Sequence, residues 1–229
     1  MNTEQPILIT GIPRSGASMI AGVINLCGAF SGDVSYHKGA YENGAILRFV
    51  EESYLQTYGF DPMGQFPLPD VKLIPNYWKK SIETHLIAEG YSKGPWMYKS
   101  SRLSLLWKIW HNAYPNAKWI IVRRKTPDII QSCIKTGYMK AFKDNQVCQT
   151  VGANSEQEGW LWWIHQYEEI FVEMVMAGVN CKQIWPERMV SGDYKQLYET
   201  IEWLGLPWKS EILNFIDPLL WSSRNKKGG

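Results

Sequence analysis

One sequence feature constrains the fold of this chain most. It is an apolar run that is followed by a turn between two glycines and then by an amphipathic run. Residues 7–10 are Ile-Leu-Ile-Thr, a short apolar stretch typical of a buried strand, and residues 11–18 read Gly-Ile-Pro-Arg-Ser-Gly-Ala-Ser. Residues 19–26 carry apolar side chains at helical spacing. This order predicts a strand, a tight turn and a helix whose first amides and positive end can hold an anion.

The turn has the spacing of the phosphate-binding motif G-x-x-x-x-G-K-[ST], with Ala17 in place of the lysine. No lysine of this turn therefore reaches a β- or γ-phosphate, whereas Arg14 brings a planar, permanently charged guanidinium into it. This exchange favours a phosphate or sulfate ester over ATP as the ligand. The alternative is a turn that needs its glycines for backbone reasons only and leaves Arg14 in solvent.

A second apolar run ends on three consecutive cations. Residues 119–122 predict a buried strand, Arg123, Arg124 and Lys125 follow it, and Pro127 suits the first turn of a helix. Ligands of open α/β sheets lie beyond the carboxyl ends of the strands, so we expect this cluster and the first turn to face one crevice. There the cations would meet two anionic groups of one ligand. Three consecutive cations more often lie on a solvated surface. Here they directly follow a predicted buried strand, which argues against that interpretation.

The alternation of strand and helix patterns predicts one α/β domain over residues 1–229, with a three-layer fold like that of P-loop nucleotide hydrolases. Its central, mainly parallel sheet is expected to be flanked by helices. Residues 222–229 are expected to form a flexible tail. Strands are predicted near 6–10, 95–99, 118–122 and 182–190, and helices near 16–27, 44–57, 76–89, 103–114, 127–137, 156–178, 194–204 and 208–216.

Composition excludes several classes of protein. A net charge of +2 is too small to predict wholesale binding to nucleic acid or membranes. No apolar run approaches the length of a membrane span, and no leader pattern precedes the first strand, which together predict a cytoplasmic protein. The four cysteines have neither disulfide-framework nor metal-ligand spacing, so we expect reduced thiols and no metal site. These are Cys27, Cys133, Cys148 and Cys181.

Twelve tryptophans are unusual for a chain of 229 residues. Trp160, Trp163, Tyr167 and Phe171 recur at helical spacing, which indicates a helix face. Such a face is more often packed into the core than used as a ligand platform, so we predict packing. Some of these rings could instead form an acceptor pocket.

Four segments, in this order along the chain, together resemble the sulfotransferase superfamily, and within it the small bacterial and phage enzymes. Residues 13–18 resemble the 5′-phosphosulfate loop P-[RK]-S-G-T-[ST], and residues 96–102 resemble a strand that ends on a lysine. Arg124, with Ser132 eight residues later, resembles the 3′-phosphate motif. Residues 189–206 resemble a Y-E-D-L segment that leads to a helix ending L-G-L.

The resemblance implies that the cofactor is 3′-phosphoadenosine-5′-phosphosulfate (PAPS), the sulfuryl donor of this superfamily. Carried over by position, its contacts on this chain are Arg14, Ser15, Gly16, Ala17, Ser18, Arg124, Ser132 and Tyr194. Arg224 joins them because the tail resembles the basic C-terminal segment that reaches the 3′-phosphate. The superfamily usually has Thr where Ala17 stands, so one hydroxyl contact is missing here.

The catalytic base must also differ from one branch of the superfamily. That branch has a histidine where this chain has Ser101, and the resemblance to other branches implies a glutamate as the base instead. Residues 39–42, Gly-Ala-Tyr-Glu, resemble a G-[YF]-[FW]-E segment, so Glu42 is the first candidate, His37 the second and Asp33 the third. Glu42 has an equally common alternative meaning, an acidic residue near the start of a helix.

These residues predict in-line, metal-independent transfer of a sulfuryl group to a hydroxyl or amine of a small-molecule or carbohydrate acceptor. Lys99 and Arg14 are expected to stabilise the charge on the leaving phosphate oxygen while a base takes the acceptor proton. The alternative for Lys99 is a strand-end lysine in solvent. Two alternative functions stay open: a P-loop kinase of nucleosides or similar small molecules, and a nucleotide-binding protein without catalysis.

Overall fold

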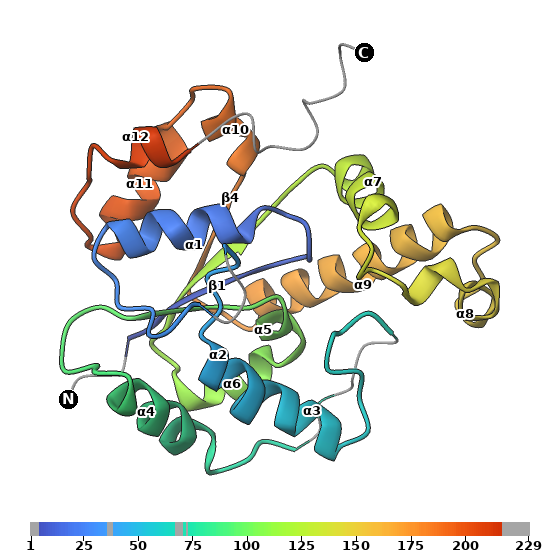
Figure 1. Ribbon diagram of the computed structural model, residues 1–229, viewed down its shortest axis with the longest axis horizontal. Coiled ribbons are helices and arrows are strands. Elements are labelled where there is room, and N and C mark those ends of the chain that lie inside the picture. The colour runs from blue at the N-terminus through green and yellow to red at the C-terminus, as the bar shows by residue number, and fades with distance from the viewer. Residues whose placement is uncertain (1–4, 36–38, 67–70, 72, 217–229) are drawn as a thin grey trace.

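The computed structural model describes residues 5–35, 39–66, 71 and 73–216, and its centre is a four-stranded parallel sheet (Figure 1). The strand order is β2-β1-β3-β4, and each neighbouring pair is parallel. In the register, Ile9 of β1 lies beside Lys99 of β2 and Ile120 of β3, so these strands end at one edge. The strands are β1 (Ile7–Gly11), β2 (Met97–Lys99), β3 (Lys118–Val122) and β4 (Cys181–Ile184).

Side chains alternate along the strands between two buried clusters, as successive residues of a strand point to opposite faces of a sheet. Leu8, Tyr98 and Ile121 belong to the larger cluster, whereas Ile9 and Ile120 belong to the smaller one. Both faces of the sheet are therefore covered, which explains the nearly continuous apolar sequence of β1 and β3.

Each cluster is completed by its own set of helices, which gather on opposite sides of the sheet (Figure 1). The smaller cluster takes buried side chains from α1 (Ala17–Leu26), α10 (Pro186–Val190), α11 (Lys195–Leu204) and α12 (Ile212–Phe215). The larger takes them from helices that include α4 (Trp78–Ala88), α5 (Arg102–Leu105), α6 (Trp107–Ala113), α7 (Thr126–Lys135) and α9 (Glu156–Met176). The predicted three-layer α/β architecture is confirmed.

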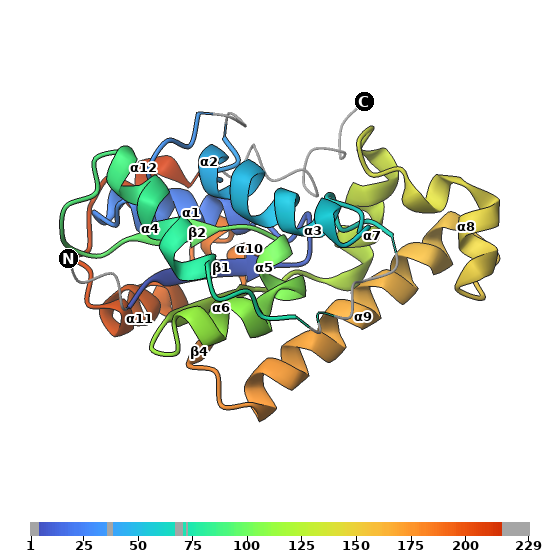
Figure 2. The same ribbon diagram turned by 90° about the horizontal axis from the view of Figure 1, so that it is seen from below.

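The tryptophan-rich segment forms the long helix α9, which runs along the molecule (Figure 2). Trp160, Trp163, Tyr167 and Phe171 are all buried, and the Trp163 ring centroid lies 5.3 Å from that of Trp160 and 4.9 Å from that of Tyr167. The prediction that this face packs into the core is confirmed.

Several predicted boundaries were wrong. The strand predicted to 190 ends at Ile184, because Pro186 starts α10 with the fixed backbone angle that suits a first helical turn. The helix predicted over 103–114 is interrupted at Leu106, and the one predicted over 208–216 is reduced to α12. The polar stretch 138–155 contains two short helices, η2 (Ala141–Lys143) and α8 (Asn145–Thr150).

The helix predicted over 44–57 is present, but its middle is a π-helix. It consists of α2 (Gly44–Ile46), the π-helical turn η1 (Leu47–Glu52) and α3 (Ser53–Thr57). Turns of this wide type are rare and are frequently found at functional sites.

Among the residues that the structure describes, no helix has the length and apolarity needed to cross a membrane. The tail predicted at 222–229 lies outside the described residues.

Candidate functional site

The turn between β1 and α1 is built on two residues with left-handed backbone angles. Gly16 has a φ of 95° and precedes the first turn of α1, and Arg14 has a φ of 76° although it is not a glycine. The Ser15 amide donates to the Ile12 carbonyl at 2.9 Å, which closes the turn. The amides of the first helical turn have no acceptor within the helix. The predicted strand, turn and helix are thus present, with the first turn of α1 on a cavity.

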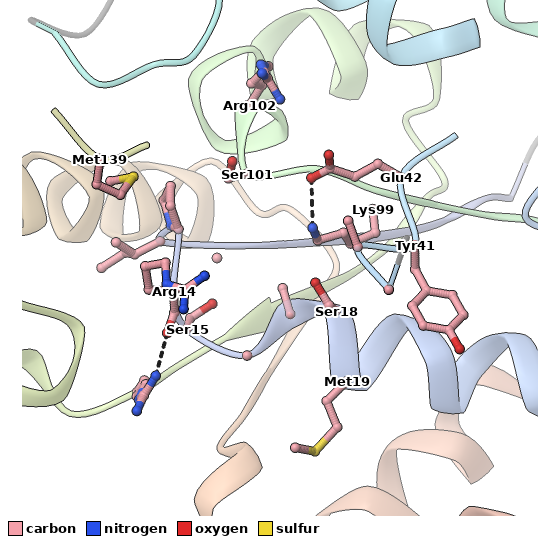
Figure 3. A pocket seen from close by; sticks show the side chains of 18 of the residues that line it. Arg14, Ser15, Ser18, Met19, Tyr41, Glu42, Lys99, Ser101, Arg102 and Met139 are labelled. Atoms are coloured by element: carbon pink, nitrogen blue, oxygen red, sulfur yellow. Dashed lines mark hydrogen bonds and ion pairs between the residues drawn. The ribbon is translucent and has the colours of Figure 1, made fainter. Parts of the chain in front are cut away.

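That cavity, of about 900 Å³, lies at the carboxyl edge of the sheet (Figure 3). Its walls come from segments far apart in the sequence: the turn and first residues of α1, the loop before α2, the end of β2 and the segment after α7. Lining residues include 11–19, 39–42, Met63, Gln65, Lys99, Ser101, Arg102, Arg124, Tyr138, Met139 and Phe215.

Arg14 and Arg124 line one side of the cavity, and Ser132, which does not line it, is hydrogen-bonded to Arg14. Arg124 Nη1 donates to the backbone oxygen of Arg14 at 2.9 Å, and Arg14 Nε donates to Ser132 Oγ at 2.8 Å. Arg14 Nη1 also donates to the Tyr138 hydroxyl at 2.9 Å. Burial lowers the pKa of Arg124, although an arginine remains a cation in a protein. The structure thus brings Arg14, Arg124 and Ser132 together; their role as ligands of a nucleotide stays a prediction.

The three consecutive cations at the end of β3 separate. Arg123 turns away from the cavity, pairs with Glu168 of α9 and places its guanidinium carbon 5.4 Å from the ring centroid of Phe171. Arg124 lines the cavity, whereas Lys125 is exposed. The sequence predicted that these three cations form one cluster, but only Arg124 contacts the turn between β1 and α1. The reason is that neighbouring residues of an extended chain point in opposite directions.

The other side of the cavity holds an ion pair between two predicted catalytic residues. Lys99 Nζ, at the end of β2, lies 2.7 Å from Oε1 of Glu42, and the two side chains are 9% and 12% exposed. Figure 3 shows both side chains directed toward each other beside the first turn of α1. Lys99 therefore does not point into solvent, and the two groups are close enough to act on one bound molecule.

The position of Glu42 is fixed by the residue that follows it. Asn43 is buried and caps α2, because its Oδ1 accepts from the Ile46 amide at 2.9 Å. Its Nδ2 donates to the Ser31 carbonyl at 3.2 Å and to a carboxylate oxygen of Glu89. The loop that carries Glu42 is thereby tied to the segment after α1 and to the end of α4 rather than left free.

The remaining candidates are placed less favourably or lie outside the described residues. Asp33 is exposed and does not line the cavity; hydrogen bonds from Ser35 lower the pKa of its carboxyl group. Tyr194 precedes α11, packs against the smaller cluster and does not line the cavity. His37 and Arg224 lie outside the described residues.

A buried carboxyl group that the sequence did not reveal supports the end of β2. Glu51, in the π-helical turn, is fully buried and accepts from the Tyr98 hydroxyl at 2.9 Å and from Ser100 Oγ at 2.8 Å. Trp110 Nε1 donates to it as well, at 3.2 Å. Tyr98 and Ser100 flank Lys99, so the strand on both sides of this lysine is held by one carboxyl group.

Glu51 is expected to make stability depend on pH. Burial raises the pKa of Glu51 from 4.5 to about 7, although Arg102 and the hydrogen bonds from Ser100 and Tyr98 act in the opposite direction. The folded state then keeps a proton that the unfolded chain releases, so the free energy of unfolding contributed by this group falls as pH rises from about 4.5 to about 7. At about 1.4 kcal/mol per pKa unit, the loss is on the order of 3 kcal/mol.

Denaturant unfolding of the native protein and of Glu51→Gln at pH values across this window measures that effect. The glutamine side chain cannot titrate, so the effect of the substitution itself on stability is the same at every pH. The free energy of unfolding of the native protein should therefore fall relative to that of the variant as pH rises. Parallel curves would show that Glu51 does not change its protonation differently in the folded and unfolded states.

A second feature missed by the sequence analysis is a clamp made by Gln65. Its Nε2 donates to the Tyr138 carbonyl at 2.9 Å, and its Oε1 accepts from the Lys140 amide at 2.8 Å. Gln65 is 5% exposed. The clamp joins the loop that contains Met63 to the segment that contains Met139, and both methionines line the cavity. No local pattern indicates a contact between segments so far apart in the chain.

The described residues contain no group of three or more histidine, cysteine, aspartate or glutamate side chains placed to hold a metal ion. Cations around the cavity come instead from arginine and lysine side chains.

Fold comparison identifies the class of structure to which this arrangement belongs. The chain has a sulfotransferase-type fold. No protein-family model matches it, and no curated protein matches its sequence.

Two mycobacterial sulfotransferases are among the solved structures that match. Sulfotransferase STF9 from Mycobacterium avium matches with a TM-score of 0.63 and 11% identity, over 100% of this chain and 70% of that one. Sulfotransferase STF1 from Mycobacterium tuberculosis H37Rv matches with a TM-score of 0.50 and 13% identity, over 93% of this chain and 70% of that one. Identities this low establish the shared fold alone.

Proposed function

We propose that this protein is a sulfotransferase that uses PAPS and transfers its sulfuryl group to a hydroxyl or amine of a small-molecule or carbohydrate acceptor. One observation carries the proposal. A single cavity has the anion-binding turn with Arg14 and Arg124 on one side and the Lys99–Glu42 pair on the other. The first group suits a doubly anionic donor, and the second suits proton transfer beside it.

The residues present fit the donor. Ser15 Oγ is buried and has no hydrogen-bond partner among the described residues, so the turn keeps a hydroxyl group that a ligand oxygen can satisfy. Residues 14–18 hold the 5′-phosphosulfate through this hydroxyl, the amides of the first helical turn and the Arg14 guanidinium. Arg124 and Ser132 hold the 3′-phosphate. Ala17 contributes only its backbone.

The transfer step follows from these positions. The acceptor oxygen attacks the sulfur atom in line with the bond between sulfur and the phosphate oxygen, which breaks, and the phosphate keeps the electron pair. Glu42 takes the proton of the acceptor. Lys99 stabilises the charge on the leaving phosphate oxygen, for which its ammonium group exchanges the Glu42 carboxylate for that oxygen.

Thermal denaturation with two ligands tests the choice of nucleotide. We expect 3′-phosphoadenosine 5′-phosphate (PAP), added without metal, to raise the melting temperature more than ATP with magnesium, because bound ligand stabilises the folded state. Preferential stabilisation by ATP would favour the kinase interpretation and contradict this proposal.

Transfer of labelled sulfate from PAPS to a panel of phenols, sugars and lipids then tests catalysis. Labelled product is the expected result. Binding of the nucleotide without transfer to any member of the panel would favour a nucleotide-binding protein that lacks catalysis.

A further inference from the structure

One buried titratable group has no part in the transfer step proposed above. Glu51 lies in the π-helical turn η1, is 0% exposed and does not line the cavity. Burial opposes its ionised form and raises the pKa of Glu51 to about 7. Arg102, whose charge acts against this shift, is itself paired with Glu52, whose Oε1 lies 3.0 Å from Arg102 Nη2. Apolar side chains in these places would avoid the cost of burying a carboxyl group, so stability alone does not explain Glu51.

Three hydrogen-bond donors converge on this carboxyl group. Its Oε2 accepts from the Tyr98 hydroxyl at 2.9 Å and from Ser100 Oγ at 2.8 Å, and its Oε1 accepts from Trp110 Nε1 at 3.2 Å. Ser100 Oγ itself accepts from the Arg102 amide at 3.1 Å, so the Ser100 proton is directed to Glu51. An ionised carboxyl group only accepts hydrogen bonds, so this set of partners suits a carboxylate.

These contacts hold the chain on both sides of Lys99. Successive side chains of a strand point to opposite faces of the sheet, so Tyr98 and Ser100 point away from Lys99. Accordingly, Tyr98 belongs to the larger cluster, whereas the Lys99 side chain lies beside the first turn of α1 (Figure 3). Because one carboxylate oxygen binds the residue before Lys99 and the residue after it, a rotation of the backbone at Lys99 would break one of these hydrogen bonds. Glu51 therefore fixes the direction in which Lys99 leaves the strand.

The end of β2 is also tied to the strand that leads into the anion-binding turn. Thr10 Oγ1 donates to the Ser100 carbonyl at 3.0 Å and lies 2.7 Å from Ser104 Oγ. All three side chains are 0% exposed, so water does not compete for these hydrogen bonds. Thr10 directly precedes Gly11, which lines the cavity. The buried network thus sets the position of Lys99 relative to the turn between β1 and α1.

From these contacts we infer that Glu51 is a positioning residue for sulfuryl transfer, which holds Lys99 where its ammonium group reaches the leaving phosphate oxygen. This inference rests on the proposed function. It adds to that function a side chain that touches neither the nucleotide nor the acceptor. Lys99 acts on a charge that appears as the bond between sulfur and oxygen breaks, so a displaced Lys99 should slow transfer more than it weakens binding of PAPS.

Steady-state kinetics of Glu51→Gln tests this role. The amide keeps the size of the side chain but has a single acceptor oxygen, so it cannot accept from all three donors. We expect kcat to fall about fivefold or more while KM for PAPS changes less than about threefold, the signature of an interaction made in the transition state. A smaller fall in kcat, or a rise in KM that exceeds the fall in kcat, would overturn the inference.

A double-mutant cycle shows whether Glu51 acts through Lys99. Lys99→Met keeps a long unbranched side chain without its charge and should lower kcat about 10²-fold or more. Adding Glu51→Gln to Lys99→Met should lower kcat by less than about twofold further, because the group that Glu51 positions is already absent. A general structural role would give the full loss in both backgrounds, and that result would overturn the inference.

Two further variants cover poor folding of Glu51→Gln and a loss of stability. Tyr98→Phe removes one donor hydroxyl and should lower kcat about threefold or more in the native background, but not in Lys99→Met. Equal losses in the two backgrounds would overturn the inference. Ile201→Val shortens a buried side chain of α11 in the smaller cluster and is the control; it should lower thermal stability and leave kcat within about twofold in either background.

The outcomes separate this inference from the proposed function. Additive losses in a protein that transfers sulfate would overturn the role of Glu51 while the proposed function stands. Absence of transfer by the native protein to every acceptor of the panel would contradict the proposed function, and the inference would fall with it.

Discussion

Glu42→Gln should lower the turnover of sulfuryl transfer by about 10²- to 10⁴-fold, the usual contribution of a positioned general base. The amide keeps the size and shape of the carboxylate but cannot take a proton from the acceptor. PAP binding should persist, because the donor contacts lie at the turn and at Arg124. Steady-state kinetics with the best acceptor of the panel, together with calorimetric titration of PAP, measures both effects in one variant.

One control variant makes this result specific. Glu169→Gln removes the same charge from an exposed position of α9 and should leave turnover intact. If Glu42→Gln retains turnover, Glu42 is not the base, and His37→Ala and Asp33→Asn become the next variants to measure. A simultaneous loss of PAP affinity would place Glu42 in nucleotide binding instead.

Arg124→Ala should weaken PAP binding by about 10- to 100-fold, since a hydrogen bond to a charged group contributes about 1.5–3 kcal/mol. The change also removes the hydrogen bond from Arg124 to the backbone of Arg14, which helps to hold the turn. Arg124→Lys separates the two causes in part, because lysine keeps the charge and loses the planar, two-pronged donor. Calorimetric titration of PAP measures each affinity.

The neighbouring cations provide the matched controls. Lys125→Ala removes an equal charge from an exposed side chain and should change PAP affinity little. Arg123→Ala should lower thermal stability, because Arg123 packs against Phe171 and pairs with Glu168, while affinity for PAP is retained. Equal losses of affinity in the Lys125 and Arg124 variants would indicate a diffuse electrostatic effect and not a 3′-phosphate contact.

The sequence predicted the sheet and the proximity of Arg14 and Arg124 because their signals are local. An apolar run that leads into a glycine turn or into a row of cations indicates a strand end, and parallel strands bring such ends to one edge. The amino-acid pattern by itself therefore places Arg14, Arg124 and Ser132 near one another. The strand β4 was predicted too long because apolar residues 189–190 outweighed the helix-start signal of Pro186.

Other parts of the site depend on contacts that no short pattern encodes. Glu51 reaches the end of β2 from a π-helical turn, and a sequence with helical spacing does not reveal where one extra residue enters a turn. The Gln65 clamp and the Glu52–Arg102 pair each join segments that are far apart in the chain. Glu42 could be nominated from its local pattern, but its pairing with Lys99 required the three-dimensional arrangement.

At Arg14 the backbone conformation favours glycine, whereas the side-chain contacts require arginine. A residue with a side chain is strained at a φ of 76°, and glycine would relieve that strain. Glycine would also take away the guanidinium that reaches Ser132 and Tyr138. Under the proposed function, a substitution chosen at this position only to raise thermal stability would therefore lower the affinity for the sulfuryl donor.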